Sequence, residues 1–133
     1  MFTNSSMTIY NKHTVPATKN VIYKGTAIDN VFWDSIESVS ERNGANKQDE
    51  VVVYIPFDKN DISNYVQPKQ YDGSANKWTL KEGDIIVKGN LISTIPNIDK
   101  ISDLKNYEAF TIYFVDEKDF GNYNMQHFKV KGK

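Results

Sequence analysis

The two histidines, His13 and His127, are the side chains of this sequence best suited to hold a metal ion. Neither has a carboxylate at the helical spacing that metal ligands use, and the sequence contains no cysteine to supplement them. A zinc site needs three or four converging ligands, and His127 lies in an expected strand, where a surface or hydrogen-bonded histidine is the commoner role. The histidines therefore predict no metal site.

Acidic and glycine-containing segments are the next candidates for chemistry. The segment 58–61 (Asp-Lys-Asn-Asp) carries oxygen ligands but lacks the glycine and the distal glutamate of a calcium-binding loop, and 116–119 is a similar acidic turn. The serines form no Gly-x-Ser-x-Gly elbow. Gly83 and Gly89 flank an expected strand, whereas a nucleotide-binding fingerprint opens a helix. We therefore expect no catalytic residue, no cofactor and no metal, and hence no enzyme.

Short β-branched and aromatic runs, separated by turn signals, dominate the rest of the chain. The clearest is 50–57, where five consecutive apolar residues end at Pro56; in 81–89 a turn feeds the apolar run 85–87. A stripe of Ile98, Ile101 and Leu104 is the only helical signal, within 97–107, where Asp99 or Ser102 would cap the helix start. The further expected strands are 7–11, 21–23, 27–33, 77–80, 91–95, 109–115 and 123–130. This pattern predicts a mainly β fold, a small barrel or sandwich of about seven or eight short strands with one short helix.

Two polar segments, 38–49 and 58–75, are expected to be long surface loops. The second contains Tyr65 and Tyr71, whose rings either plug the end of the barrel or contact another subunit. For the aromatic residues in expected strands, core packing is the expected role. These residues are Trp33, Trp78, Phe110, Tyr113 and Phe114.

Length and charge limit the classes of function. The 133 residues fit one domain, residues 1–133, with a net charge of −1 and neither half strongly charged. A dedicated nucleic-acid binder would carry a basic face. The one local excess is Lys129, Lys131 and Lys133, a solvated edge or a basic patch. Without a signal peptide or a membrane-length apolar run, we expect a soluble protein of the compartment in which it is made.

The order of motifs along the whole chain is similar to that of a family of small proteins encoded in phages and prophages of Gram-positive bacteria. The resemblance rests on Thr-Ile-Tyr-Asn (8–11), Trp33, Val-Val-Tyr-Ile-Pro (52–56), Gly-Asp-Ile-Ile-Val-Lys-Gly (83–89) and the closing segment 111–130. Chains of this size and layout also resemble the head-completion, or head–tail stopper, proteins of long-tailed phages. Those proteins are small β-barrels that assemble as a ring beneath the portal and its adaptor, retain packaged DNA and present a surface to the tail.

The resemblance implies a non-enzymatic virion structural protein, found in the virion and, during assembly, in the host cytoplasm. Its partners would be portal, adaptor and tail proteins, with a homo-oligomeric ring in the virion, a possible monomer alone, DNA only as passing cargo, and no membrane. A tail terminator or tail-completion protein is the alternative, and an oligonucleotide-binding barrel, using tyrosine and phenylalanine stacking, is a further one. Residues expected to make interactions are Tyr65, Tyr71, Lys129 and Lys131.

Overall fold

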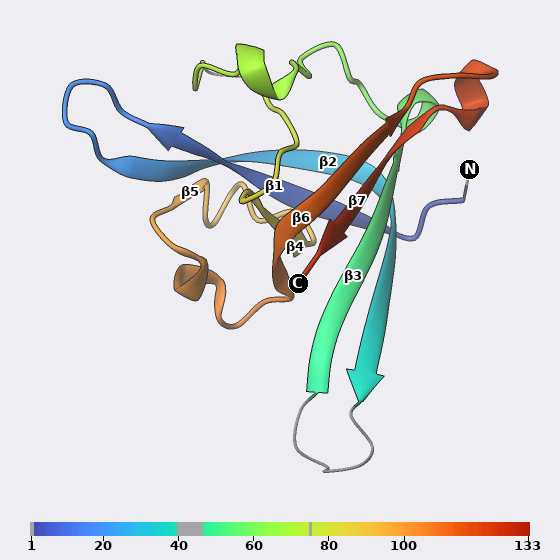
Figure 1. Ribbon diagram of the computed structural model, residues 1–133, viewed down its shortest axis with the longest axis horizontal. Coiled ribbons are helices and arrows are strands. Elements are labelled where there is room, and N and C mark those ends of the chain that lie inside the picture. Colours follow the sequence, from blue (N-terminus) through green and yellow to red (C-terminus); the bar gives the residue numbers. More distant parts are fainter. Residues whose placement is uncertain (1, 40–46, 75) are drawn as a thin grey trace.

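The computed structural model describes residues 2–39, 47–74 and 76–133, and about half of them lie in the strands of a single antiparallel β-sheet (Figure 1). The strands are β1 (Ser5–Thr14), β2 (Val21–Val39), β3 (Lys47–Pro56), β4 (Ile85–Lys88), β5 (Asn97–Ile98), β6 (Ala109–Lys118) and β7 (His127–Gly132). Single 3-10 turns occur at η1 (Phe57–Lys59), η2 (Pro68–Gln70), η3 (Ile101–Leu104) and η4 (Tyr123–Met125).

Six of the strands close into a barrel. The sheet order is β1-β4-β6-β7-β3-β2-β5, and an additional β1–β2 pairing joins the two ends of the six-strand run. The nineteen-residue strand β2 makes the closure possible, because its first half pairs with β1 up to Val31 and its second half pairs with β3 from Phe32 onward. The expected mainly β fold is confirmed, and of the two predicted architectures the strand pairing is that of the barrel.

The barrel interior is filled from alternate positions of its strands. In β3 the side chains of Val51, Val53 and Ile55 are fully buried, whereas Val52 and Tyr54 between them are half-buried. The five-residue apolar run therefore alternates between buried and half-buried side chains, as expected for a barrel wall with one wet face. The interior is completed by Met7, Ile9, Ile28, Val31, Trp33, Trp78, Leu80, Ile86, Phe110, Ile112, Phe128 and Val130.

Two predicted core aromatics lie outside the barrel. Trp33, Trp78 and Phe110 are buried as expected, but Tyr113 and Phe114 are 36% and 37% exposed. The cause is a register shift between β6 and β7: Ile112 is opposite Gly132, whereas Phe114, two residues on, is opposite Lys131. The extra residue of this bulge, Tyr113, breaks the alternation, so two consecutive rings reach the outer surface.

The bounds of several strands also differ from the predicted ones. The expected strands 21–23 and 27–33 are one continuous strand, which runs on to Val39. Ser38, Val39 and residues 47–49 of the predicted loop 38–49 are strand residues, and 40–46 lie outside the described residues. The expected strand 77–80 contributes only an isolated bridge from Trp78 to Tyr65, and 91–95 is mainly a turn.

The helix predicted over 97–107 is reduced to the four-residue turn η3. Its start is capped by Asp103, which accepts the backbone N–H groups of Asp99 at 3.0 Å and Lys100 at 3.3 Å, rather than by Asp99 or Ser102. In the predicted apolar stripe, Ile98 and Leu104 are buried, but Ile101 is 40% exposed. Two buried contacts are too few to hold a longer helix against the barrel.

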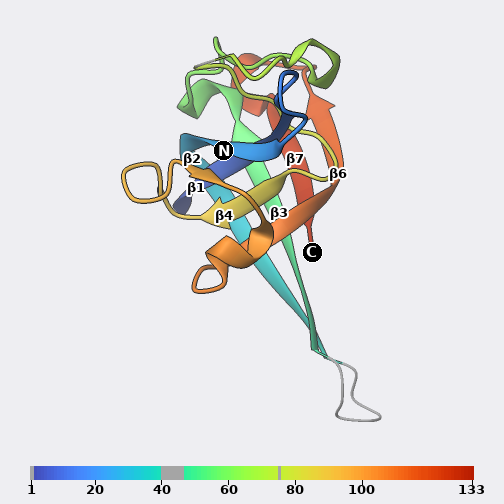
Figure 2. The same ribbon diagram turned by 90° about the vertical axis from the view of Figure 1, so that its left-hand side faces the viewer.

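One part of the structure stands away from the barrel. β1 reaches β2 only as far as Val31, and β7 reaches β3 only as far as Val51, so beyond these residues the two strands pair solely with each other. We call the paired segments 34–39 of β2 and 47–50 of β3 the β-arm. Figures 1 and 2, at right angles to each other, both show it extending away from the barrel.

Candidate interaction surface

A row of lysines over aromatic rings covers the outer wall of β7. Lys129, Lys131 and Lys133 occupy alternate positions, and the buried residues between them, Val130 and Gly132, face the interior. The Lys129 Nζ atom lies 5.9 Å from the ring centre of Tyr54, that of Lys131 lies 5.1 Å from Phe114, and that of Lys133 lies 4.8 Å from Tyr113. Each pair is a cation–π contact of about 0.5–1 kcal/mol at such an exposed site.

The rings come from the strands on either side of β7, because of the register of the sheet. Tyr54 of β3 is directly opposite Lys129, and Phe114 of β6 is directly opposite Lys131. The bulge places Tyr113 beside the chain end, where Lys133 exchanges two backbone hydrogen bonds of 3.0 Å with Thr111. We call these six side chains, three lysines and three rings, the lysine–aromatic face.

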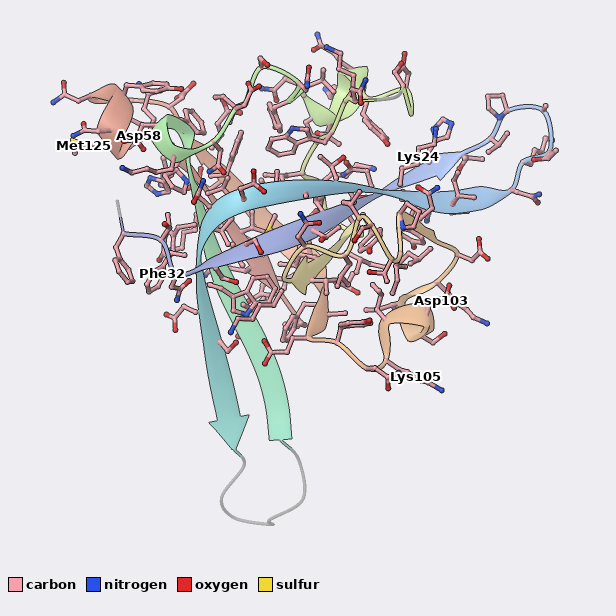
Figure 3. The ribbon with its side chains drawn as sticks, turned by 180° about the vertical axis from the view of Figure 1, so that it is seen from behind. Lys24, Phe32, Asp58, Asp103, Lys105 and Met125 are labelled. Atoms are coloured by element: carbon pink, nitrogen blue, oxygen red, sulfur yellow. The ribbon has the colours of Figure 1, made fainter. Side chains whose placement is uncertain are left out.

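A second row of rings continues the lysine–aromatic face toward the N-terminus. His127 lies 5.7 Å from Tyr54, Tyr54 lies 6.1 Å from Phe32, and Phe32 lies 5.8 Å from Phe2, between ring centres. Phe2 is 71% exposed. Figure 3 shows Phe32 where β2 bends from the barrel into the β-arm, so the row ends at the base of the β-arm.

Tyr65 covers one end of the barrel. Its ring centre is 4.6 Å from that of Phe128 and 5.1 Å from that of Trp78, and the Val66 N–H donates to the Trp78 carbonyl at 2.9 Å. The side chain is half-buried, and its outer side borders a surface groove shared with Phe114. Of the two predicted roles for Tyr65, these contacts favour the plug.

Tyr71 lies over a buried polar cluster. The segment that carries Tyr65 and Tyr71 crosses β1 at this point, and we call it the crossing segment. The Tyr71 ring is 6.4 Å from the His13 ring and 5.3 Å from the Lys81 Nζ atom. Beneath it, the buried Asp84 carboxylate accepts hydrogen bonds from the Asn11 amide at 2.7 Å, the Lys12 backbone N–H at 2.9 Å and the Lys81 ammonium at 3.0 Å. Burial nevertheless raises the pKa of Asp84, against these donors.

This polar cluster fastens the crossing segment to the barrel. The Asn11 side chain bonds both the carbonyl and the N–H of Thr79, at 2.7 and 3.2 Å, and the Lys24 ammonium donates to the Gly73 carbonyl at 2.7 Å. The Gly73 backbone lies against the His13 ring, where a Cβ would approach within 2.6 Å. Both Asp84 oxygens accept hydrogen bonds from these structural donors, so the carboxylate helps to hold the segment in place.

The acidic turns likewise form local contacts. The Asp61 carboxylate accepts the backbone N–H and the hydroxyl of Ser63 at 3.0 and 2.6 Å, which lowers the pKa of Asp61. Asp116 pairs with Lys118 at 2.7 Å. Within residues 2–39, 47–74 and 76–133, no three histidine or carboxylate side chains gather in a way that could hold a metal ion.

The structure thus separates the four residues predicted to make interactions. Lys129 and Lys131 lie together on the lysine–aromatic face, whereas Tyr65 and Tyr71 lie on the segment that covers the barrel. Sequence reasoning missed Tyr54 and assigned Phe114 to the core. The alternation of lysines in 129–133 was the available signal, but the rings beneath them come from strands distant in sequence.

Comparison with known proteins adds a family but no function. None of the helical turns in the described part of the chain is long and apolar enough to cross a membrane. Neither the curated proteins nor the solved structures include a match to the chain. Residues 2–133 do match a family of unknown function, DUF6751, and because the match spans almost the whole sequence, the chain belongs to that family.

Proposed function

We propose that this protein is a non-catalytic structural subunit of a phage virion, and specifically a head–tail stopper that assembles as a ring beneath the portal and adaptor. The observation that carries the proposal is the division of the molecule into a closed barrel and a projecting β-arm (Figures 1 and 2). Such a subunit would occupy the virion and, during assembly, the host cytoplasm, with DNA passing through the ring.

The closed barrel suits a repeated structural subunit. Six strands pair around the barrel, so few unpaired strand edges remain on it for non-specific pairing with other chains. Its interior is apolar, and the segment carrying Tyr65 and Tyr71 is fastened to it. A rigid unit of this kind loses little conformational entropy when it joins an assembly.

The outer surface carries exposed aromatic and apolar side chains of the kind that form contacts between proteins. Tyrosine and phenylalanine are enriched at protein interfaces, and three exposed or half-exposed rings lie on the lysine–aromatic face. Further large apolar side chains are exposed in the β6–β7 connection, where Phe120 is 69%, Tyr123 is 54% and Met125 is 60% exposed. Exposed apolar groups gathered in this way are typical of binding surfaces.

Electron microscopy of particles from a phage lacking this gene would test the proposal. Emptied heads beside finished but unattached tails are the result expected for a stopper. Full heads with missing or overlong tails would instead identify a tail terminator or tail-completion protein. Normal virions would refute the connector proposal, and supplying the intact gene on a plasmid is the control for the deletion itself.

A second candidate function is favoured by one observation. Lysines interleaved with exposed rings are also the chemistry that binds single-stranded nucleic acid, in which bases stack on the rings and ammonium groups neutralise phosphates. If the lysine–aromatic face binds nucleic acid, the fluorescence anisotropy of a labelled oligothymidylate will rise on adding the protein. That rise would fall steeply with salt and be lost in Lys131→Glu. An unchanged anisotropy would exclude this function.

A further inference from the structure

The second half of β6 has an open edge. β4 pairs with β6 only as far as Thr111, and the turn before β4 then bonds Ile112, whose N–H donates to the Asp84 carbonyl at 2.8 Å and whose carbonyl accepts the Gly83 N–H at 2.9 Å. Beyond Ile112, β6 continues to Lys118 with β7 on one side, and no strand of the described part of the chain pairs with its other side. An unpaired strand edge is a template for pairing with another chain.

The register of β7 shows which backbone groups point to this open edge. Lys133 exchanges two hydrogen bonds with Thr111, so every second residue of β7, counted back from Lys133, bonds to β6. Their partners in β6 are Phe114, Asp116 and Lys118. Val115 and Glu117 therefore direct their N–H and carbonyl groups away from β7. Within residues 2–39, 47–74 and 76–133, no hydrogen bond satisfies these four backbone groups.

A surface groove of about 460 Å³ follows the open edge. It is lined by Phe114 on the outer face of β6, and also by Val115 and Glu117, whose side chains point to the opposite face. A groove bordered by both faces of one strand runs along the edge of that strand. The crossing segment and the residues before β4 form its other wall, with apolar area from Tyr65 and the buried Leu80.

The charges around the groove favour a basic side chain in its interior. The lining contains the carboxylates of Glu82 and Glu117 and a single ammonium group, that of Lys81. The Lys81 ammonium is already 3.0 Å from the buried Asp84 carboxylate. The other cations nearby belong to the outer face of β6, where Lys131 lies over the Phe114 ring and Lys118 pairs with Asp116. The inner side of the groove is therefore acidic.

We propose that this edge of β6 binds an extended segment of a partner protein, which adds a strand beside Val115 and Glu117 and places a lysine or arginine side chain between Glu82 and Glu117. In strand addition, main-chain hydrogen bonds provide affinity and pockets for alternate side chains provide specificity. The incoming cation would replace the Gln67 amide, which donates to the Glu117 carboxylate at 3.1 Å, because a charged donor binds a carboxylate more strongly than a neutral one. This inference goes beyond the proposed virion role and does not rest on it.

The pairing geometry specifies a peptide probe. In an antiparallel addition, the residue opposite Glu117 precedes the residue opposite Val115 by two positions. The capped peptide Thr-Lys-Thr-Val-Thr then places its lysine at the carboxylates and its valine against Tyr65 and Leu80. Proton–nitrogen correlation NMR of the labelled protein measures binding. We expect the amide signals of Val115 and Glu117 to shift with a dissociation constant below about 1 mM, and Thr-Glu-Thr-Val-Thr to bind at least about tenfold more weakly. The amide of Asp116, which bonds to β7, should shift less.

Methylation of backbone nitrogens in the peptide separates strand addition from charge attraction alone. In the proposed pairing, the lysine and valine nitrogens face β6 and the central threonine nitrogen faces solvent. Methylating the first two should abolish the shifts, whereas methylating the third should leave the affinity within about twofold, because it removes no hydrogen bond to β6. Equal losses from the two kinds of methylation would overturn strand addition.

Charge reversal tests the basic residue of the partner. Glu82→Lys changes an exposed side chain in a turn and should weaken binding of the lysine peptide by at least about threefold while strengthening that of the glutamate peptide. Glu108→Lys makes the same charge change at an exposed position at the other end of β6 and is the matched control. Equal effects of the two variants would refute a specific contact with the groove carboxylates.

Two other results would overturn the proposal. Shifts of the Val115 and Glu117 signals that depend on protein concentration without any peptide would show that a second copy of the chain covers the edge. Unchanged signals at about 1 mM peptide, in a protein with the spectrum of a folded domain, would show that the edge does not accept a strand. These measurements use the isolated protein, so their outcome and that of the phage gene deletion are independent.

Discussion

Replacing Asp84 with asparagine tests whether the buried polar cluster is structural and whether burial dominates its electrostatics. The carboxylate accepts three hydrogen bonds on two oxygens, from Lys12 and Lys81 on Oδ1 and from Asn11 on Oδ2. An asparagine in the same position keeps one oxygen. Its amide nitrogen then faces either the Asn11 amide or the donors of Lys12 and Lys81. In both orientations a donor faces another donor and at least one hydrogen bond is lost.

The magnitude follows from counting these groups. Losing a hydrogen bond to a charged acceptor costs about 1.5–3 kcal/mol, and leaving a buried donor unpaired costs about 1–3 kcal/mol. Removing a buried charge recovers part of this cost, because the desolvation of the carboxylate disappears. We expect a net destabilisation of about 2 kcal/mol, which lowers the melting temperature by roughly 6–8 °C for a domain of this size. Rotation of the Asn11 amide cannot relieve the conflict, because Asn11 is held by both backbone groups of Thr79.

The pH dependence of this variant gives a sharper criterion. Burial raises the pKa of Asp84, so the native state binds this proton more tightly than the unfolded chain does. The group therefore contributes most stability below the ordinary aspartate pKa of about 3.9, and that contribution is lost as pH rises through the folded-state pKa. Asp84→Asn has no such titration, so its destabilisation relative to the parent should shrink as pH rises from acid toward neutral.

Urea unfolding at a series of pH values measures both quantities. The exposed Asp119→Asn is the control and should change stability by less than about 0.5 kcal/mol. A destabilisation by Asp84→Asn that grows with pH would refute the reasoning, because it would mean that the Lys81 ion pair and the other donors outweigh burial. No destabilisation at any pH would mean that the cluster does not hold the crossing segment.

Substitutions at two further positions test the packing of the barrel. Gly132→Ala should destabilise the folded protein by about 1–3 kcal/mol, because its Cβ would lie 2.8 Å from the Phe110 Cβ and 3.3 Å from Val51 Cγ1. Urea unfolding measures this cost. A variant as stable as the wild type would show that β7 can shift outward. Tyr65→Ala should cost about 2–3 kcal/mol through lost contacts with Trp78 and Phe128, whereas Tyr65→Phe should cost less than about 1 kcal/mol. Equal losses in the two Tyr65 variants would assign the effect to the hydroxyl and contradict the plug.

Local sequence signals predicted those parts of the fold that local physics determines. The β-branched run of β3 and the turn before β4 were located correctly. In that turn Gly83 adopts a φ of +94°, a conformation that is unfavourable for residues with a Cβ. The closure of the barrel could not be predicted in this way, since it depends on one long strand, β2, changing partners near Val31. Gly25 interrupts the apolar pattern in the first half of β2 and so gave the appearance of two strands. It is nevertheless a strand residue, whose N–H donates to the Pro96 carbonyl at 2.9 Å and where a Cβ would lie 2.6 Å from that oxygen.

The candidate site was only half predictable for a related reason. The alternating lysines of 129–133 are visible in the sequence, but their rings are supplied by β3 and β6 through register. The bulge that exposes Tyr113 and Phe114 leaves no local sign, because an inserted residue is defined only relative to the partner strand. The Asn11–Asp84 bond likewise joins residues 73 positions apart. Such pairs are set by tertiary structure, and single-sequence patterns do not contain them.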